Sequence, residues 1–217
     1  MIENVTINGK HCLNDLGLYL TDVDIGAPDL RTNYVTVPGR DGYLDLSTAL
    51  DGEMHFDERK ITLTFGCGAG RKWADTMAAF YALVHGQTVK LIFDNDSEHY
   101  YSGRGSISSM DRDGDKLTIK MTATCQPYRY AVTATTIYRT LSTSQVSITL
   151  TNNGRPVVPS ITAESSTTLI FGSYTTTLSA GTWTVPSIRL ANGANTIKAK
   201  ATDGSGKVTF TWNEVTL

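Results

Sequence analysis

Paired cysteines, long apolar runs and an excess of one charge are all missing from this sequence of 217 residues. Its three cysteines, Cys12, Cys67 and Cys125, are odd in number and far apart, and no CxxC pair or Cys/His cluster occurs. This spacing argues against a disulfide framework and a zinc site, and it fits reduced thiols in a cytosol. We expect Cys67 and Cys125 to be small buried hydrophobes, because both are in phase with apolar neighbours.

No stretch approaches the roughly 18 consecutive apolar residues of a membrane span. The N-terminal residues also lack the basic region followed by an apolar region that marks a secretory signal. We therefore expect no membrane segment and no signal peptide. The formal net charge of −2 gives no indication of a nucleic-acid partner, so we expect no recognition of nucleic-acid sequence.

Catalytic and cofactor motifs are absent from the sequence. No GxSxG, HExxH or local Cys/His signature lies near the four histidines, His11, His55, His85 and His99. The stretch Gly66-Cys-Gly-Ala-Gly-Arg-Lys superficially resembles a glycine-rich nucleotide loop, but it lacks the Lys-Ser/Thr that such a loop needs. A strand-to-helix turn is the better interpretation. We expect no enzymatic activity, no cofactor and no metal.

Two acidic clusters, residues 94–98 and 111–115, raise the question of calcium. Alternate acidic residues supply the oxygen ligands that Ca²⁺ requires. Neither cluster has the complete EF-hand spacing, and Asp113-Gly114 lies between two alternating runs, where a hairpin turn is expected. A surface turn is favoured for both clusters, with calcium as the alternative.

Charge and hydroxyl content divide the chain into two parts. Residues 1–130 contain 13 Lys and Arg and 18 Asp and Glu, whereas residues 131–217 contain 6 and 3. The second part also contains 30 Ser and Thr, which alternate with apolar residues as in strands with one solvated face. We predict a first domain over 1–130 and a second over 131–217.

Period-2 alternation predicts that the first domain is mostly strand, with its clearest run from Leu117 to Cys125. One short helix is expected near residues 72–85, because large residues recur at helical spacing and Gly86 suits a left-handed cap. The helix should cover the sheet in a β-sandwich-like domain, with Trp73, Phe80 and Tyr81 in the core. Further strands are expected around Val5, Leu18, Val35, Ile61 and Val89.

The second domain is predicted to be an antiparallel β-sandwich without helices, because turn residues separate about eight short alternating runs. The whole chain is therefore expected to be all-β with one short helix. The strands of the second domain are expected near residues 132–140, 145–152, 160–164, 168–172, 174–178, 182–190, 195–201 and 207–213.

The stretch Val37-Pro-Gly-Arg-Asp-Gly-Tyr-Leu predicts a sharp chain reversal with Arg40 at or near its tip. Residues 48–58, which follow it, show little apolar periodicity that would anchor them to their own core. The local pattern fits two interpretations equally. One is an arm that packs on another subunit, and the other is a mobile loop.

The order of these features resembles that of the distal tail proteins of long-tailed, non-contractile bacteriophages. The resemblance covers residues 1–128 and rests on Asp15-Leu-Gly-Leu, Val37-Pro-Gly-Arg-Asp-Gly, Leu44-Asp-Leu-Ser and Arg59-Lys-Ile-Thr-Leu-Thr-Phe, followed by the helix and Ala123-Thr-Cys-Gln-Pro-Tyr. The second half resembles the galectin-like C-terminal sandwich of that family, through Asn152-Asn-Gly-Arg-Pro and Leu190-Ala-Asn-Gly-Ala-Asn.

The resemblance implies a structural virion protein at the phage tail tip, assembled in the host cytoplasm. Its first domain would form a six-fold ring of identical copies, which joins the tail tube protein to a tail-associated tip protein. The second domain would hold receptor-binding or accessory proteins. Family members use an extension to grip the neighbouring subunit, so the resemblance favours the arm and makes eight residues candidates for the subunit interface: Val37, Pro38, Gly39, Arg40, Asp41, Gly42, Tyr43 and Leu44.

A carbohydrate-binding module within residues 131–217 is the alternative function. The aromatic residues Tyr174, Trp183 and Trp212 motivate it, because sugar sites need flat rings beside polar groups. Trp183 and Trp212 both lie in alternating strands, a pattern that favours inward packing at least as much as exposure to a sugar. The second domain has only three acidic residues, Glu164, Asp203 and Glu214. A cell-wall hydrolase has no paired-carboxylate or metal signature to support it.

Overall fold

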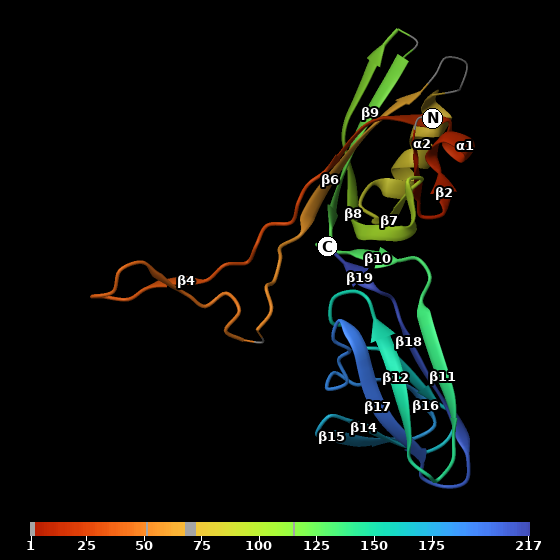
Figure 1. Ribbon diagram of the computed structural model, residues 1–217. Helices are drawn as coiled ribbons and strands as arrows, with labels where there is room; N and C mark the ends of the chain where they lie inside the picture. The colour runs from red at the N-terminus through yellow and green to blue at the C-terminus, as the bar shows by residue number, and fades with distance from the viewer. Residues whose placement is uncertain (1–2, 51, 68–72, 115) are drawn as a thin grey trace. The chain divides into compact units, whose positions relative to one another are not determined.

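The computed structural model describes residues 3–50, 52–67, 73–114 and 116–217. The chain is built almost entirely of antiparallel strands, which confirms the all-β prediction (Figure 1). It divides into two compact units, Met1–Arg129 and Tyr130–Leu217. Each unit has its own apolar core, and each is described separately.

The main sheet of the first unit has the strand order β2-β1-β7-β8-β9-β6-β3, with antiparallel neighbours throughout. Alternation along β9 buries Leu117, Ile119 and Met121 and exposes Thr118 and Lys120 between them, as predicted. The strands are β1 (Val5–Ile7), β2 (Lys10–His11), β3 (Leu18–Ile25), β6 (Arg59–Cys67), β7 (Thr88–Phe93), β8 (Asp96–Asp113) and β9 (Lys116–Cys125).

Strand β8 was not among the predicted strands, because its serines and glycines hide the alternation. It begins at Asp96, so only residues 94–95 of the surface turn predicted over 94–98 form a turn. The structure explains why one of these glycines, Gly103, is needed. A Cβ atom at this position would lie 2.1 Å from the carbonyl oxygen of Thr124 on β9, so no larger residue fits without moving the backbone. The residue that weakens the strand pattern in the sequence is thus required by close strand packing.

Two helices are present in the described residues, whereas one was predicted. Helix α2 (Trp73–Val84) is the predicted helix, and Gly86 follows it in the left-handed conformation. Helix α1 (Cys12–Leu16) was missed, because a helix of five residues is too short to show a period. Local hydrogen bonds define it: the His11 ring accepts from the Asn14 amide at 3.1 Å, and Asp15 accepts from the His11 amide at 2.8 Å.

The prediction that Trp73 and Tyr81 belong to the core is wrong. Their exposed fractions are 48% and 39%, and only Phe80 of the three rings is buried. Phe80 packs edge-on against Phe65 with ring centroids 5.4 Å apart. Tyr81 is the next residue along the helix, about 100° further around it, and so turns away from the sheet. Trp73, at the start of α2, lies instead beside the Arg112 guanidinium of β8.

The second unit is a sandwich of two four-stranded antiparallel sheets, ordered β11-β18-β13-β16 and β12-β17-β14-β15. All eight predicted strands are present, although β16 ends at Thr184 and not near residue 190. The strands are β11 (Thr135–Leu141), β12 (Val146–Asn152), β13 (Ser160–Ala163), β14 (Thr167–Phe171), β15 (Tyr174–Leu178), β16 (Gly181–Thr184), β17 (Gly193–Ala201) and β18 (Gly206–Trp212), while β10 (Arg129–Ala131) pairs with β19 (Val215–Thr216).

Candidate assembly surface

Residues 26–58, between β3 and β6, leave the main sheet and return to it; we call this segment the arm. The outgoing and returning segments of the arm are paired near its base. The Arg31 amide donates to the His55 carbonyl at 2.9 Å, and the Asp57 amide donates to the Asp29 carbonyl at 2.8 Å. The side chains of Arg31 and Asp57 form an ion pair. The arm is therefore an ordered two-chain extension in its described residues, and not an open loop.

The outer part of the arm is a hairpin of β4 (Tyr34–Thr36) and β5 (Tyr43–Asp45). The Leu46 amide closes it with a 2.8 Å hydrogen bond to the Asn33 carbonyl. At the tip, the Arg40 amide donates to the Val37 carbonyl at 3.2 Å, so Arg40 lies within the predicted reversal.

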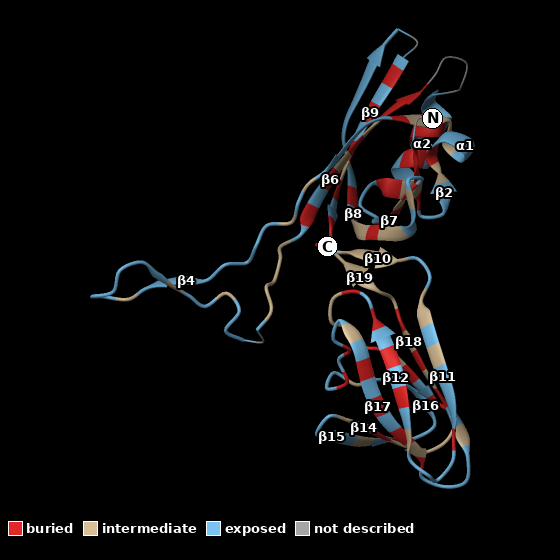
Figure 2. Ribbon diagram, in the orientation of Figure 1, coloured by how far each residue is buried: buried red, intermediate tan, exposed pale blue. Residues whose placement is uncertain are grey.

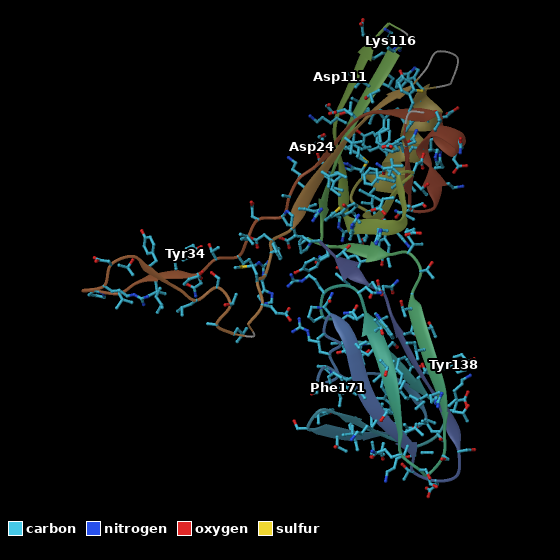
Figure 3. All side chains as sticks on the ribbon, in the orientation of Figure 1. Asp24, Tyr34, Asp111, Lys116, Tyr138 and Phe171 are labelled. Atoms are coloured by element: carbon cyan, nitrogen blue, oxygen red, sulfur yellow. The ribbon has the colours of Figure 1, made fainter. Side chains whose placement is uncertain are left out.

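Apolar side chains on the arm are open to solvent to an unusual degree. Figure 2 shows most of the arm as exposed, and Figure 3 shows the Tyr34 ring projecting from β4. Single exposed apolar residues are common on proteins, but a cluster of them on an extended hairpin indicates an interaction surface. The exposed members are Leu30 (54%), Tyr34 (56%), Val35 (39%), Tyr43 (69%), Leu46 (36%) and Leu50 (94%).

The two faces of the hairpin differ in chemistry. Val35 lies directly opposite Leu44 in the register, so one face is aliphatic. Tyr34 and Tyr43 occupy the other face, with ring centroids 6.2 Å apart. A hairpin of this length buries little apolar area by itself, and an isolated two-stranded hairpin is marginally stable in water. A partner that covers these faces would stabilise it.

The structure brings the eight predicted interface residues together at the end of this hairpin. Six of them are exposed, and Val37 and Leu44 are half-buried. Sequence reasoning missed five residues that extend the exposed apolar surface beyond the tip: Leu30, Tyr34, Val35, Leu46 and Leu50. Their only signal in the sequence was the occurrence of large apolar residues in a stretch without strand or helix period. Their role in an interface stays a prediction.

The acidic cluster at residues 94–98 is engaged in contacts within the protein. Asp96 contacts the His99 ring at 2.6 Å and the Arg129 guanidinium at 2.7 Å. Partial burial opposes the effect, but the His99 hydrogen bond and the charges of His99 and Arg129 lower the pKa of Asp96 below its ordinary value. Asp94 accepts from the Asn4 amide at 3.1 Å. These contacts engage two carboxylates of the cluster, Asp94 and Asp96, within the protein.

The second acidic cluster ends β8 and begins the turn to β9, with Asp115 outside the described residues. Within the residues that the structure describes, no three His, Cys, Asp or Glu side chains are placed to bind one metal ion. The predicted turn at 66–72 also lies mostly outside the described residues, which stop at 67 and resume at 73. No helix in the described part of the chain is long and apolar enough to span a bilayer.

The aromatic residues of the second unit divide between core and surface. Trp212 is buried, so it offers no flat surface to a ligand, contrary to the exposure that motivated a sugar site. Trp183 is 41% exposed although it is opposite Ile161 in the register, because β16 is an edge strand. Its indole donates to the Ser179 carbonyl at 3.0 Å. Tyr174 is 37% exposed on β15, in the other sheet.

No model of a known protein family matches this sequence, and no curated protein matches it. Among solved structures, the chain is similar to the crystal structure of the SPP1 Dit (gp 19.1) protein, described there as a paradigm of the hub adsorption apparatus in phages that infect Gram-positive bacteria. The TM-score is 0.67 with 17% sequence identity, and the match covers 100% of both chains. At this identity the comparison establishes a shared fold, in both units.

Proposed function

We propose that this chain is a non-enzymatic structural protein of a bacteriophage tail tip, a distal tail protein that assembles with copies of itself. The exposed apolar hairpin of the arm carries this proposal. A chain that functioned alone would gain nothing from an ordered extension with six exposed apolar side chains. The full-length similarity in fold to a phage hub protein supports the same assignment.

Each copy extends its arm to the next copy around a ring of six. The arm and the surface that receives it are different parts of the chain, so the interface is heterologous. Such an interface forms a closed ring when the rotation between neighbouring copies is one sixth of a turn. The first unit forms the ring, and the eight residues from Val37 to Leu44 belong to the interface. Polar contacts within the arm support this role, because they preorganise the hairpin before it binds.

The ring joins the tail tube protein to a tail-associated tip protein, and the second unit docks receptor-binding or accessory proteins. The protein thus belongs to the virion and is assembled in the host cytoplasm. Protein docking suits the second unit better than sugar binding. Two of its three acidic residues already have partners within the protein, since Glu164 pairs with Lys207 and Glu214 accepts from Asn153.

Removal of the hairpin tests the proposal. Residues 34–45 are replaced by Gly-Gly, which joins Asn33 to Leu46. The backbones of these two residues are already hydrogen-bonded to each other. We expect the melting temperature to change by only a few degrees, because the segment is an exposed tip. Analytical ultracentrifugation should show that the ring is lost. Two single substitutions give a milder test. Tyr43→Ser should weaken assembly, whereas Thr36→Ser, at the position opposite Tyr43 in the hairpin, is the control and should leave assembly unchanged.

Normal assembly of the hairpin-deleted chain would refute the role given to the arm. Unfolding of that chain would show that the hairpin belongs to the core of the first unit, which would also contradict the proposal.

A further inference from the structure

A ring built by arms requires a receiving surface on each copy. Because the interface is heterologous, this surface differs from the arm itself. It must offer open apolar area in the single chain, and it must accept the charges of the hairpin tip. Two hollows in the first unit offer apolar area, and they differ in composition and position.

The first hollow, of about 350 Å³, lies along the second half of β3. Its lining includes Val23 and Ile25, but also Glu3 and Asp22, so both its charged groups are acidic. It is also next to the base of the arm of its own chain, which begins at residue 26 directly after β3. Its acidic character does not suit a tip that carries Arg40 and Asp41 side by side.

The second hollow, of about 360 Å³, lies between α1 and α2. Four of its six lining residues are apolar: Leu16, Ala79, Ala82 and Leu83. The core stripe of α2 does not use Ala79 or Ala82, which are exposed, and their short side chains allow another chain to approach the helix closely. Leu13, one turn before Leu16 on α1, is 44% exposed and extends the apolar area.

The two charged residues of this lining have opposite signs. Lys10 comes from β2 and Asp15 from α1. The hairpin tip likewise carries one charge of each sign, Arg40 and Asp41, followed by the exposed Tyr43. The tip and the hollow are therefore complementary in charge as well as in apolar character.

We propose that the hairpin tip of a second copy of this chain occupies the hollow between α1 and α2, with Asp41 near Lys10 and Arg40 near Asp15. This inference rests on the proposed function and specifies the receiving surface. The tip residues 38–42 are exposed in the single chain, so the tip is available to another copy. Fully extended, the chain from residue 26 to residue 40 spans at most about 50 Å, which is ample reach to a neighbour.

The first experiment fills the hollow. Ala79→Glu places a bulky charge in the lining, and Ala78→Glu makes the same change at the adjacent exposed position of α2, outside the lining. Both variants should keep the wild-type circular dichroism spectrum and melting temperature within a few degrees. We expect Ala79→Glu to weaken self-association at least tenfold in ultracentrifugation and Ala78→Glu to leave it unchanged.

A second experiment exchanges charges and does not depend on filling the hollow. Asp41→Lys and Lys10→Glu each place like charges together, and each should weaken association about threefold to tenfold. The double variant restores an opposite pair with the signs exchanged, so its association should return to near the wild-type value. Additive weakening in the double variant would overturn the pairing.

A mixing experiment separates this inference from the proposed function. The hairpin-deleted chain keeps its hollow, and the Ala79→Glu chain keeps its arm. Each should be monomeric alone, and together they should form a 1:1 dimer that grows no further.

If Ala79→Glu assembles normally while the hairpin-deleted chain does not, the arm binds elsewhere and this inference fails alone. If Val23→Glu and not Ala79→Glu blocks assembly, the hollow along β3 is the receiving surface and the inference is likewise overturned. If both the hairpin-deleted chain and Ala79→Glu assemble normally, the proposed function fails with it.

Discussion

At the scale of single residues, the buried side-chain amide of Asn195 binds backbone groups of the turn that leads into β17. Its oxygen accepts from the Ala191 amide at 2.8 Å, and its nitrogen donates to the Ala191 carbonyl at 2.8 Å and the Gly193 carbonyl at 3.0 Å. The turn residues Asn192-Gly-Ala-Asn therefore do more than permit a reversal, because the last of them also satisfies the backbone groups of the turn.

We expect Asn195→Ala to lower the free energy of unfolding of the second unit by about 1–3 kcal/mol, because partly buried backbone groups of the turn and the buried Leu150 carbonyl lose a partner. Urea denaturation measures this change. Thr196→Ala, the adjacent residue on the solvent-facing side of β17, is the control and should cost less than about 1 kcal/mol. Equal losses for the two variants would show that the amide contacts add nothing to stability.

The thiol of Cys12 makes the stability of the first unit depend on alkaline pH. Burial, with smaller effects from Asp15 and Asp94, raises the pKa of Cys12 from 9.0 to about 12. The unfolded chain therefore releases this proton at a lower pH than the folded chain does. The stabilisation from the neutral buried thiol is complete below pH 9 and is lost as the pH rises toward 12.

Denaturation of the wild type and of Cys12→Ala at pH 8, 9.5 and 11 tests this dependence. The stability advantage of the wild type should shrink at each step, since only the wild type carries the titrating thiol. All other ionisable groups are common to both proteins, so their contributions cancel in the comparison. An advantage that stays constant over this range would contradict the assignment.

At the scale of elements, the structure shows which face of helix α2 packs against the sheet. Phe80 is fully buried against Phe65, whereas Tyr81 lies beside His85 at the surface. We expect Phe80→Ala to destabilise the first unit by about 3–5 kcal/mol and Tyr81→Ala by less than about 1 kcal/mol. Thermal denaturation of both variants measures the difference. Similar losses would mean that both rings belong to the core.

Period explains which elements could be predicted from the sequence. Strands β6 and β9 and helix α2 have long apolar repeats, and the sequence predicts them because burial on one face imposes the repeat. Helix α1 depends on side-chain caps, and β8 depends on close backbone contact at Gly103, neither of which leaves a period. Tertiary packing also decides between Trp183 and Trp212, since an edge strand exposes one ring and a central strand buries the other.

The candidate surface was predictable only in part, for the same physical reason. Pro38, Gly39 and Gly42 mark the chain reversal, so its tip can be read from turn chemistry. Leu30 and Leu50 carry no such mark, and only the structure shows that they are exposed on the arm. The hollow between α1 and α2 could not be predicted at all, because one of its helices was not predicted and its lining comes from segments distant in the sequence.

At the scale of the whole molecule, the account rests on one claim, that copies of this chain close into a ring through their arms. The first unit carries an ordered extension with exposed apolar side chains, which a single copy of the chain leaves uncovered. Closed heterologous assembly explains the extension and limits the size of the particle. It also predicts one stoichiometry and not a ladder of sizes.

Native mass spectrometry of the full chain at high concentration tests this claim most directly. The account predicts a dominant species of six chains, about 142 kDa from a chain of 23.6 kDa, that is absent for the hairpin-deleted variant. A wild-type protein that remains at the mass of one chain under these conditions would contradict it.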